Sequence, residues 1–446
     1  MSFSTASLRA VLEAHAPAAA TGLVVALSGG ADSACLLAAA AQLEVSPRRL
    51  TLRAVHVDHG LQAASGAFRI ACAAQCRQFD VELRILPVLV DCAPGVSIEE
   101  AARESRYSAL AQELRAGECL LTAHHRTDQA ETLLLQALRG AGVKGLSAMP
   151  ICRAFGRGWH LRPLLGVEQR ELLEFGAPLV TAVAEDPMNE DLRFDRAYLR
   201  RHIWPLIESR WPGASASLAR SAAHLAEAQG LLDEAAAVDV SRLRDGDALS
   251  VPGLRALSQA QRINALRHWL FKAEVVPPPT HRLAEALRQM LEAEADHLPA
   301  IAWGDFALRR YRERLFLTPA EPPKLTDAVQ WTAASSSRLE LGPGLGELRW
   351  AARDGGLEPE RLPAALSVRR RRGGETLKPA RNASTQSVQH LCQSMGILPW
   401  MRDALPLVFA GDTLIAIGDL WLDARWCAPV GRPGLGLVWA GAPIIV

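Results

Sequence analysis

The sequence predicts an α/β fold, made of a parallel sheet covered by helices and followed by a helical middle domain and a small mixed α/β C-terminal domain. Three observations support this prediction. Short apolar runs alternate with segments of helical period up to residue 138, Ala/Leu-rich amphipathic segments occupy residues 214–295, and Gly, Pro and short alternating runs follow Pro319. With 446 residues, the chain exceeds what one hydrophobic core usually organises, so we expect two or three domains.

In the first part, apolar runs rich in Leu and β-branched residues predict strands, and the segments between them predict helices. The strands are expected at 21–27, 50–57, 81–88 and 118–125, and the helices at 32–43, 66–79, 97–115 and 128–138. Such alternation is typical of a parallel sheet with helices on both faces, whose ligands bind beyond the carboxyl ends of the strands. We therefore expect functional residues directly after each strand.

The later elements divide the chain into three predicted domains. We expect a helix at 167–175, a short strand within 178–187, a basic helix at 193–212, helices at 214–240 and 255–295 that are split by three prolines, and strands at 338–342, 346–352 and 414–422. Prolines and changes in composition place the boundaries. The domains are an α/β domain over 1–212, a helical domain over 213–320 and a C-terminal domain over 330–446.

Composition and charge are those of an ordinary soluble globular protein. Hydrophobic residues make up 49% of the chain, charged residues make up 22%, and the net charge is +1, so nucleic-acid binding has to be argued from local basic patches. The eight cysteines form no CxxC pair, which indicates buried thiols in a reducing cytoplasm, although Cys72 and Cys76 leave a metal or redox pair open. We expect no membrane span and no secretory signal.

The stretch SGGADS, from Ser28 to Ser33, joins the first predicted strand to a helix. A helix N-terminus leaves N–H groups unpaired and carries partial positive charge, and two glycines let the backbone approach a ligand closely. The stretch contains no Lys, so it is not a GxxxxGK[ST] phosphate loop. A carboxylate beside phosphates requires a cation, so Asp32 indicates Mg²⁺. The alternative is a plain turn in which Ser28 caps the helix.

This stretch resembles the SGGxDS signature of the PP-loop ATP pyrophosphatases, which have a Rossmann-like parallel sheet and cleave ATP between the α- and β-phosphates. Further stretches resemble one group of that superfamily, the tRNA(Ile)-lysidine synthases. They are HVDHGLQAAS (56–65), EEAARESRY (99–107), TAHHRTDQAETLLLQALRGAGVKGLSAMP (122–150), RPLL (162–165), EDPMNEDLRFDRAYLRRHIWPLI (185–207), RRRRGGETLKP (369–379) and LPWMRDALPLVFAGDTLIAIGDLWL (398–422). Together they cover most of the chain.

The resemblance implies a cytoplasmic ligase that uses ATP and Mg²⁺ to attach lysine to C2 of the wobble cytidine, position 34, of an isoleucine tRNA. The reaction passes through an adenylated tRNA and releases AMP and pyrophosphate. The implied partners are tRNA(Ile) with a CAU anticodon and free L-lysine, without a membrane, and a homodimer is left open. Two alternatives are a 2-thiolase of the same superfamily, which the absence of CxxC disfavours, and a catalytically silent RNA-binding protein.

The residues and the resemblance together give the candidate site. ATP-binding candidates are Ser28, Gly29, Gly30, Ala31, Asp32, Ser33, His56 and Asp58; catalytic candidates are Asp32, Arg106, His124, Asp128 and Glu131; Asp32 is also the metal candidate. The resemblance assigns Asp128 and Glu131 to the lysine substrate, whereas their spacing by itself favours a helix capping box. Arg106 shares a helix face with Arg103, and the alternative for both is a solvated helix edge.

Arginines are the candidates for binding the tRNA backbone, because they neutralise phosphates. They are Arg196, Arg200, Arg201, Arg369, Arg370, Arg371, Arg372 and Arg402, with Arg193 as a further member of the first cluster and Trp400 as a stacking residue. For each arginine the alternative is a solvated charged face. Gln62, Thr127 and Ala197 depart from the family pattern, and we expect them to affect contacts at the edge of the site.

Overall fold

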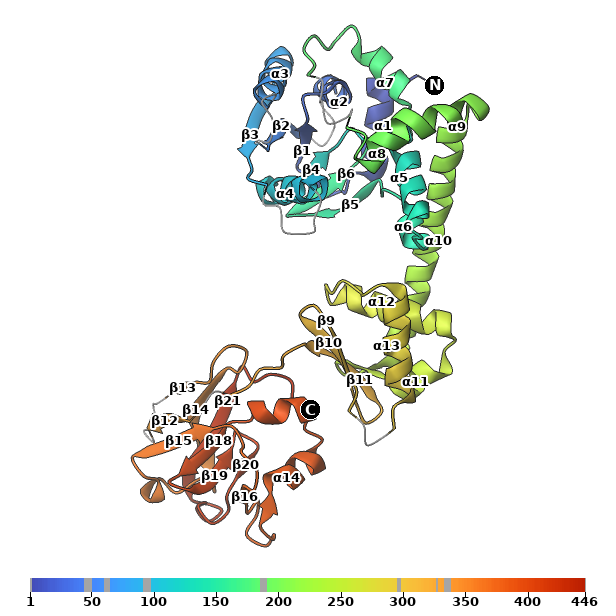
Figure 1. Cartoon of the computed structure of the whole chain (residues 1–446). Helices are drawn as coiled ribbons and strands as arrows, with labels where there is room; N and C mark the ends of the chain where they lie inside the picture. The colour runs from blue at the N-terminus through green and yellow to red at the C-terminus, as the bar shows by residue number, and fades with distance from the viewer. Residues whose placement is uncertain are drawn as a thin grey trace. The chain divides into compact units, whose positions relative to one another are not determined.

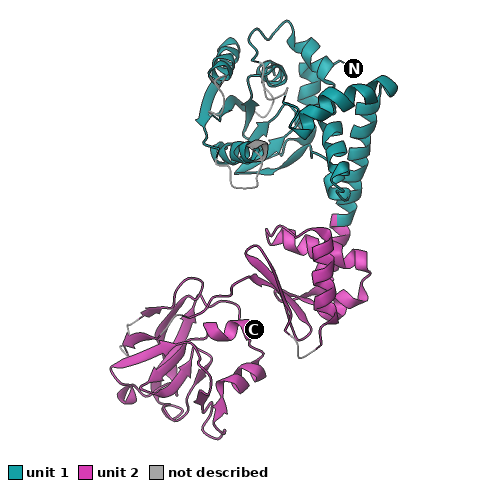
Figure 2. Cartoon of the chain, in the orientation of Figure 1, with its two compact units in different colours: residues 1–232 teal, residues 233–446 magenta. Residues whose placement is uncertain are grey.

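The computed structural model describes residues 2–43, 50–59, 65–90, 98–184, 191–294, 298–325, 328–332 and 338–445 (Figure 1). The chain forms two compact units, Met1–Leu232 and Asp233–Val446, which divide inside one long helix, α10 (Ala214–Leu243) (Figure 2). This point differs from the boundary expected after residue 212, and the three predicted domain limits remain predictions. In the described part of the chain, no helix combines the length and the apolar character needed to cross a bilayer.

The first unit is built on a six-stranded sheet in the order β3-β2-β1-β4-β6-β5. Its strands are β1 (Gly22–Leu27), β2 (Thr51–Asp58), β3 (Glu82–Pro87), β4 (Glu118–Leu121), β5 (Cys152–Phe155) and β6 (Gly158–Leu161). Strands β1 to β4 and β6 pair in parallel, and β5 runs antiparallel to β6. The predicted parallel sheet is therefore confirmed, although β4 ends before the expected limit at residue 125.

Helices cover both faces of this sheet (Figure 1). They are α1 (Thr5–His15), α2 (Ala31–Ala41), α3 (Ser65–Gln78), α4 (Ile98–Glu113), α5 (Arg126–Leu138), α6 (Val143–Leu146) and α7 (Gln169–Gly176). Successive strand residues point to opposite faces. Along β1, Leu23 and Val25 accordingly pack with apolar residues of α1, α2 and α7, whereas Val24 packs with residues of α4. The near-continuous apolar runs in the sequence reflect this burial on two sides.

Two predicted elements of the first unit differ from the structure. Residues 178–184, expected to begin a strand, form none, and 185–187 lie outside the described residues. The basic helix expected at 193–212 is divided into α8 (Asp195–Tyr198), a π-helical turn η2 (Leu199–Ile203) and α9 (Trp204–Arg210). Pro205 has no N–H to donate to the preceding turn, which accounts for the widened backbone immediately before it.

The second unit begins with the remainder of α10 and a mixed α/β segment. Its helices are α11 (Val251–Ala256), α12 (Gln259–Lys272) and α13 (Thr280–Glu292), and its strands are β7 (Arg244–Asp245), β8 (Ala248–Ser250), β9 (Ala300–Trp303), β10 (Phe306–Tyr311) and β11 (Arg314–Pro319), in the sheet order β7-β8-β11-β10-β9. The prediction of a helical middle domain is incomplete, because it did not include this sheet. Leu308 and Leu315 of the sheet pack against Leu266 and Leu283 of the helices in one buried cluster.

The last part of the chain is mostly antiparallel β structure, as its Gly- and Pro-rich sequence predicts. One sheet has the order β12-β15-β18-β19-β20, a second has β13-β14-β21, and β16 pairs with β17. The strands are β12 (Val329–Thr332), β13 (Arg338–Glu340), β14 (Glu347–Asp354), β15 (Ala365–Arg369), β16 (Thr376–Leu377), β17 (Gln386–Ser387), β18 (Leu407–Ala410), β19 (Thr413–Ile417), β20 (Trp421–Leu422) and β21 (Pro433–Ala440), with helix α14 (Val388–Met395). The strands of the two larger sheets contribute to a common buried core.

Candidate active site

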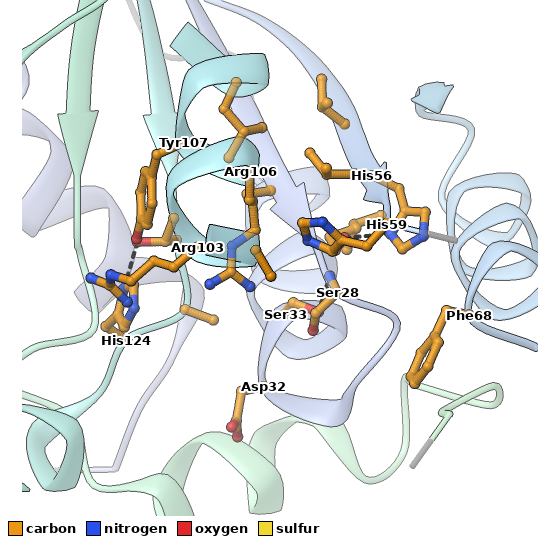
Figure 3. A pocket seen from close by; sticks show the side chains of 18 of the residues that line it. Ser28, Asp32, Ser33, His56, His59, Phe68, Arg103, Arg106, Tyr107 and His124 are labelled. Carbon is orange, nitrogen blue, oxygen red and sulfur yellow. Dashed lines mark hydrogen bonds between the residues drawn. The ribbon is translucent and has the colours of Figure 1, made fainter. Parts of the chain in front are cut away.

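A cavity of about 470 Å³ opens beyond the carboxyl ends of β1, β2 and β4 in the first unit (Figure 3). Its lining brings together polar residues from segments far apart in the sequence. They include Ser28, Asp32, Ser33, His56, Asp58, His59, Arg103, Arg106, Tyr107, Thr122, His124, Arg196 and Arg200. Parallel sheets of this kind bind their ligands at this edge, so the structure places most of the predicted site residues where the sheet topology favours a ligand.

The stretch Ser28–Ser33 forms a tight loop that leads from β1 into α2. Gly29 has a φ of 88°, in the left-handed region, and an added Cβ would lie 3.1 Å from Cδ1 of Phe68. Glycine is therefore the residue that fits this position without strain. Within the loop, Ser28 N–H donates to Ser33 Oγ at 3.2 Å, and Ser33 Oγ donates to the Gly30 carbonyl at 3.0 Å. These bonds hold the loop in its bent form.

The rest of the protein supports the loop through the carbonyl group of Gly29. This carbonyl accepts hydrogen bonds from Ala184 N–H at 3.0 Å and from Gln75 Nε2 at 3.3 Å. Gln75 is fully buried on α3, and its Nε2 also donates to the Ala182 carbonyl at 2.6 Å. The loop is thus attached to α3 and to the segment after α7.

The hydrogen bonds at the start of α2 show whether Ser28 caps this helix. The N-cap of α2 is Gly30, and no side chain of the described residues caps the first turn, so the alternative that Ser28 caps the helix is wrong. Ser28 Oγ instead accepts from Gly30 N–H at 3.2 Å. Ala31 begins the helix, and the N–H groups of its first turn keep the positive end of the helix dipole available to an anion.

Asp32 lies in this first turn and lines the cavity. Its carboxylate accepts from Gln169 Nε2 of α7 at 3.2 and 3.1 Å, and Oδ2 lies 3.8 Å from His125 Nε2. Burial raises the pKa of Asp32 above its ordinary value, although His125 and Gln169 act in the opposite direction. Among the described residues, no three His, Cys, Asp or Glu side chains form a metal cluster. Mg²⁺ is usually held by one or two carboxylates together with substrate phosphates, and Asp32 fits that mode.

Strand β2 delivers His56 and Asp58 to the cavity, as expected. His56 Nδ1 lies 2.9 Å from the Leu27 carbonyl, and since a carbonyl can only accept, Nδ1 is assigned the proton. Asp58 Oδ2 lies 3.4 Å from Arg69 Nε. His59 follows directly in the chain and was not assigned a role. Its Nδ1 is buried and has no hydrogen-bond partner among the described residues, and burial lowers its pKa.

Helix α4 contributes two arginines to the wall of the cavity. The guanidinium carbons of Arg103 and Arg106 lie 5.1 and 5.7 Å from the centre of the Tyr107 ring. Figure 3 shows the Arg106 side chain extending from α4 on the side of Ser33, and the Arg103 side chain extending toward His124. Both side chains line the cavity and are also exposed to solvent, so the choice between a ligand contact and a solvated helix edge stays a prediction. Two cations at this wall suit a negatively charged ligand.

The two carboxylates of α5 behave differently from one another. Asp128 Oδ2 accepts from His125 N–H at 2.9 Å, as a capping residue would, while Oδ1 accepts from Arg200 Nη2 at 2.5 Å. Glu131 does not cap the helix. It is 1% exposed, and its Oε1 accepts from Arg200 Nε at 2.6 Å. The capping box expected between Asp128 and Glu131 is therefore not formed, although Asp128, at the third position of α5, accepts a hydrogen bond from a backbone N–H.

These contacts form one network of alternating charge. Arg196 Nε lies 3.2 Å from Glu131 Oε2, without the alignment of a hydrogen bond. Burial would raise the pKa of Asp128, but His125 and Arg200 outweigh it, so the pKa lies below its ordinary value. Arg196 and Arg200, which we predicted as tRNA-binding residues, are therefore held inside the cavity by acids. Their role toward tRNA stays a prediction.

His124 stands at the end of a hydrogen-bonded series that sequence reasoning did not find. Its Nδ1 lies 2.8 Å from Thr122 Oγ1, which lies 2.9 Å from His160 Nε2, and His160 Nδ1 lies 3.1 Å from Arg162 Nη2. His160 and Arg162 are buried. Arg162 was visible in the RPLL stretch, but nothing in its sequence position connects it with His124.

The remaining arginine candidates lie elsewhere. Arg201 is exposed on the π-helical turn of the first unit. In the second unit, Arg369 ends β15 and pairs with Glu375 at 3.0 Å, whereas Arg370 and Arg372 are exposed. The run of four arginines thus has at least two members at the surface, and tRNA binding by them stays a prediction.

Two further arginine candidates and the stacking candidate have protein contacts of their own. Arg371 Nε lies 3.4 Å from Asp403 Oδ1, and Arg402 Nε donates to a backbone carbonyl at 3.3 Å. The Trp400 ring lies 5.4 Å from the Phe316 ring at an interplanar angle of 70°. Trp400 therefore packs against the core, which accounts for its presence without a base to stack on.

The departures from the family pattern fall at different places. Ala197 is buried and lines the cavity. Thr127 lies in the first turn of α5. Gln62 lies outside the described residues. The effect of these three residues on contacts at the edge of the site stays a prediction.

Three family models match the chain in order. The PP-loop domain matches residues 4–207, the TilS substrate binding domain matches residues 249–316, and the TilS substrate C-terminal domain matches residues 366–439. The first match contains the whole lining of the cavity.

Similar proteins match over nearly the full length. A tRNA(Ile)-lysidine synthase of Alkalilimnicola ehrlichii is 41% identical over 94% of this chain and 93% of its own length. That of Methylococcus capsulatus is 38% identical over 93% of this chain and 95% of its own. A solved U34-tRNA thiolase of Methanococcus maripaludis is similar at a TM-score of 0.42 with 16% identity, over 50% of this chain and 78% of that one, which is too distant to support an argument. On the identity and coverage of the two synthases, the chain belongs to the tRNA(Ile)-lysidine synthase family.

Proposed function

We propose that the chain catalyses the ATP-dependent attachment of lysine to C2 of the cytidine at position 34 of tRNA(Ile), which forms lysidine and releases AMP and pyrophosphate. The observation that carries the proposal is the 41% identity to a tRNA(Ile)-lysidine synthase over 94% of the chain. The cavity beyond β1 and its glycine loop without lysine support it.

The first step is adenylation. The C2 carbonyl oxygen of the cytidine attacks the α-phosphorus of ATP, the bond from that phosphorus to the bridging oxygen breaks, and pyrophosphate leaves. We assign pyrophosphate to the loop Ser28–Ser33, because the N-terminus of α2 attracts an anion. Asp32 would hold Mg²⁺, which neutralises phosphate charge when bound. Arg103 and Arg106 add positive charge at another wall of the cavity.

The second step transfers lysine. Its ε-amine attacks C2, the bond from C2 to the activated oxygen breaks, and AMP leaves with that oxygen. The ε-ammonium group of lysine has a pKa near 10.4, so it gives one proton to water or to a carboxylate of the site before the free amine attacks. We assign Asp128 and Glu131 to binding the ammonium form by charge. Because the pKa of Asp128 lies below its ordinary value, Asp128 suits ammonium binding better than proton removal.

The partners follow from the same proposal. They are tRNA(Ile) with a CAU anticodon, free L-lysine, ATP and Mg²⁺, in the cytoplasm, and a homodimer is left open. The arginines at the surface, Arg201, Arg370 and Arg372, support contact with tRNA phosphates.

The test is mass spectrometry of tRNA nucleosides after incubation of the protein with tRNA(Ile), ATP, Mg²⁺ and lysine. A mass gain on cytidine equal to lysine minus water is expected. A gain of sulfur in place of oxygen would instead identify a 2-thiolase, and an unmodified tRNA that still binds would identify a silent RNA-binding protein. The matched variant Asp32→Ala should lose ATP/pyrophosphate exchange while it retains tRNA binding.

A further inference from the structure

Four side chains connect the buried edge of the sheet with the cavity. Arg162 and His160 lie on or directly after β6, and Thr122 and His124 follow β4. Their hydrogen bonds form a series from Arg162 through His160 and Thr122 to His124, with separations of 3.1, 2.9 and 2.8 Å, and Arg162 Nη1 also donates to the Pro150 carbonyl at 2.7 Å. His160 is fully buried. The two steps described above give no role to the first three of these residues.

The direction of the series follows from its first member. A guanidinium group can only donate, so Nδ1 of His160 accepts from Arg162, and Nε2 of neutral His160 carries the proton. Thr122 has one hydroxyl proton. It accepts from His160 Nε2–H, and its proton is then directed to Nδ1 of His124. His124 consequently holds its own proton on Nε2.

The surroundings keep both imidazoles neutral. Burial lowers the pKa of His124 to about 3 and that of His160 to about 2. Asp128 on α5 favours protonation of His124, while Arg162, Arg196 and Arg103 oppose it; Arg162, Arg153 and Arg103 oppose protonation of His160. Desolvation and the arginines act together against charge.

The far side of the His124 ring belongs to the cavity. His124 lines it and is half-buried (Figure 3). Within the described part of the chain, Nε2 of His124 has no hydrogen-bond partner. It is also not one of the fully enclosed polar atoms, so it is accessible. A donor N–H with a fixed orientation is therefore presented to whatever occupies the cavity.

We propose that Arg162, His160 and Thr122 are positioning residues, which hold His124 as a neutral hydrogen-bond donor through Nε2 toward an oxygen of the bound substrate. The identity of that oxygen rests on the proposed function: it is a phosphoryl oxygen of the nucleotide or the C2 carbonyl oxygen of the cytidine. A donor placed in this way stabilises negative charge that develops on the oxygen. The same arrangement prevents Nε2 from accepting the proton of lysine, so His124 is not the base.

The first test reads the tautomer directly and does not depend on activity. The full-length protein is labelled with [¹⁵N]histidine, and the His124 signals are assigned by their loss in His124→Asn. We expect a protonated Nε2 and an unprotonated Nδ1, unchanged down to about pH 5.5. A proton on Nδ1, or a charged ring at neutral pH, would overturn the proposal.

The same signal distinguishes the two sources of the oxygen. If the acceptor is a phosphoryl oxygen, α,β-methylene-ATP without tRNA shifts the His124 Nε2–H resonance. If the acceptor is the cytidine carbonyl, the resonance moves when the tRNA is added. A resonance that neither ligand moves contradicts the proposal. Should lysidine not form while the tautomer and the nucleotide shift are observed, the proposed function fails and the positioning series stands.

The second test compares Thr122→Val with Thr122→Ser. The valine lacks the hydroxyl, so we expect kcat for adenylation to fall by about tenfold to hundredfold while KM for ATP changes by less than about twofold. His124 in this variant should populate both tautomers. The serine retains the hydroxyl and should restore the tautomer and most of kcat. Equal loss in both variants, with the wild-type tautomer kept, would show a merely structural role.

Discussion

Nε of Arg200, which lines the cavity, lies 2.6 Å from Oε1 of Glu131, a carboxylate that is 1% exposed. The two residues come from the π-helical turn and from α5. An ionised carboxylate at this depth requires a cationic partner, because a buried charge without one is strongly unfavourable. If Glu131 binds the lysine ammonium group, that group shares the carboxylate with Arg200 or replaces it.

Substitution of Arg200 tests this competition. In Arg200→Gln we expect KM for lysine to fall by about threefold to tenfold, because a competing cation is removed; the effect is modest since the Arg200 side chain is 42% exposed. The measurement is the rate of lysidine formation against lysine concentration. Arg201→Gln, on the same turn, is the matched control and should leave this KM unchanged. A rise in KM for tRNA with no change for lysine would assign Arg200 to the tRNA backbone instead.

Gly29 should not tolerate a side chain. At a φ of 88°, alanine at this position is strained by about 1–2 kcal/mol, and its Cβ would press on Phe68 at 3.1 Å. We expect Gly29→Ala to weaken ATP binding by about tenfold or more, measured by calorimetry. Gly66→Ala on α3 is the control, because nothing lies within 4 Å of its added Cβ, and it should bind ATP normally. Equal affinity of Gly29→Ala and wild type would show that the loop shape does not matter for the nucleotide.

The close approach of α2 and α7 depends on Gly176. A Cβ on this residue would lie 2.0 Å from Sγ of Cys35. Gly176→Ala should therefore lower the free energy of unfolding by about 1–3 kcal/mol, as overpacking does. Removal of the sulfur in Gly176→Ala/Cys35→Ala should recover part of the loss, measured by urea unfolding against Cys35→Ala. A double variant no more stable than Gly176→Ala would point to another cause.

We expect acid to lower the stability of the first unit, in part because Glu118 becomes protonated. Burial would raise the pKa of Glu118, but hydrogen bonds from Arg53 and from Arg115 N–H outweigh it, so the folded pKa lies below the ordinary value of 4.5. The ionised carboxylate therefore contributes stability above about pH 4.5, and this contribution is lost as the pH falls through the folded pKa.

Urea unfolding of Glu118→Gln measures this contribution. The variant leaves a buried cation partly unpaired, so we expect it to be less stable than wild type by about 3 kcal/mol near neutral pH. The difference should shrink below about pH 4. Glu13→Gln, an exposed carboxylate on α1, should show no such trend. A difference between Glu118→Gln and wild type that does not vary with pH would contradict the assignment.

The parallel sheet and the glycine turn between β1 and α2 could be predicted because each is formed by contiguous residues. Val24 and Val25 face opposite sides of the sheet and are both buried, so β1 reads as an unbroken apolar run. The glycines and hydroxyls of this turn are adjacent in the sequence, from Ser28 to Ser33. The sheet at 300–319 escaped prediction because its short strands carry Arg309, Arg310 and Arg314 among their apolar residues.

The parts of the site that escaped prediction depend on strand register. His160 reaches Thr122 because β4 and β6 pair with Leu120 opposite His160, at a separation of about forty residues. No local spacing encodes that alignment. The spacing of Asp128 and Glu131 likewise permits both a cap and a ligand. Only Asp128 accepts from a backbone N–H, that of His125, whereas both carboxylates accept from Arg200 on the π-helical turn.

The double hydrogen bond to the carbonyl of Gly29 has a thermodynamic consequence. Since Ala184 N–H and Gln75 Nε2 both donate to this carbonyl, we expect the loop to keep its shape before an anion binds. Little chain entropy is then lost on capture. Calorimetric titration with inorganic pyrophosphate should show an affinity that depends on ionic strength, with a small heat-capacity change. In Gln75→Ala, the loop should have to become ordered when the anion binds, so the affinity should be lower than in the wild type.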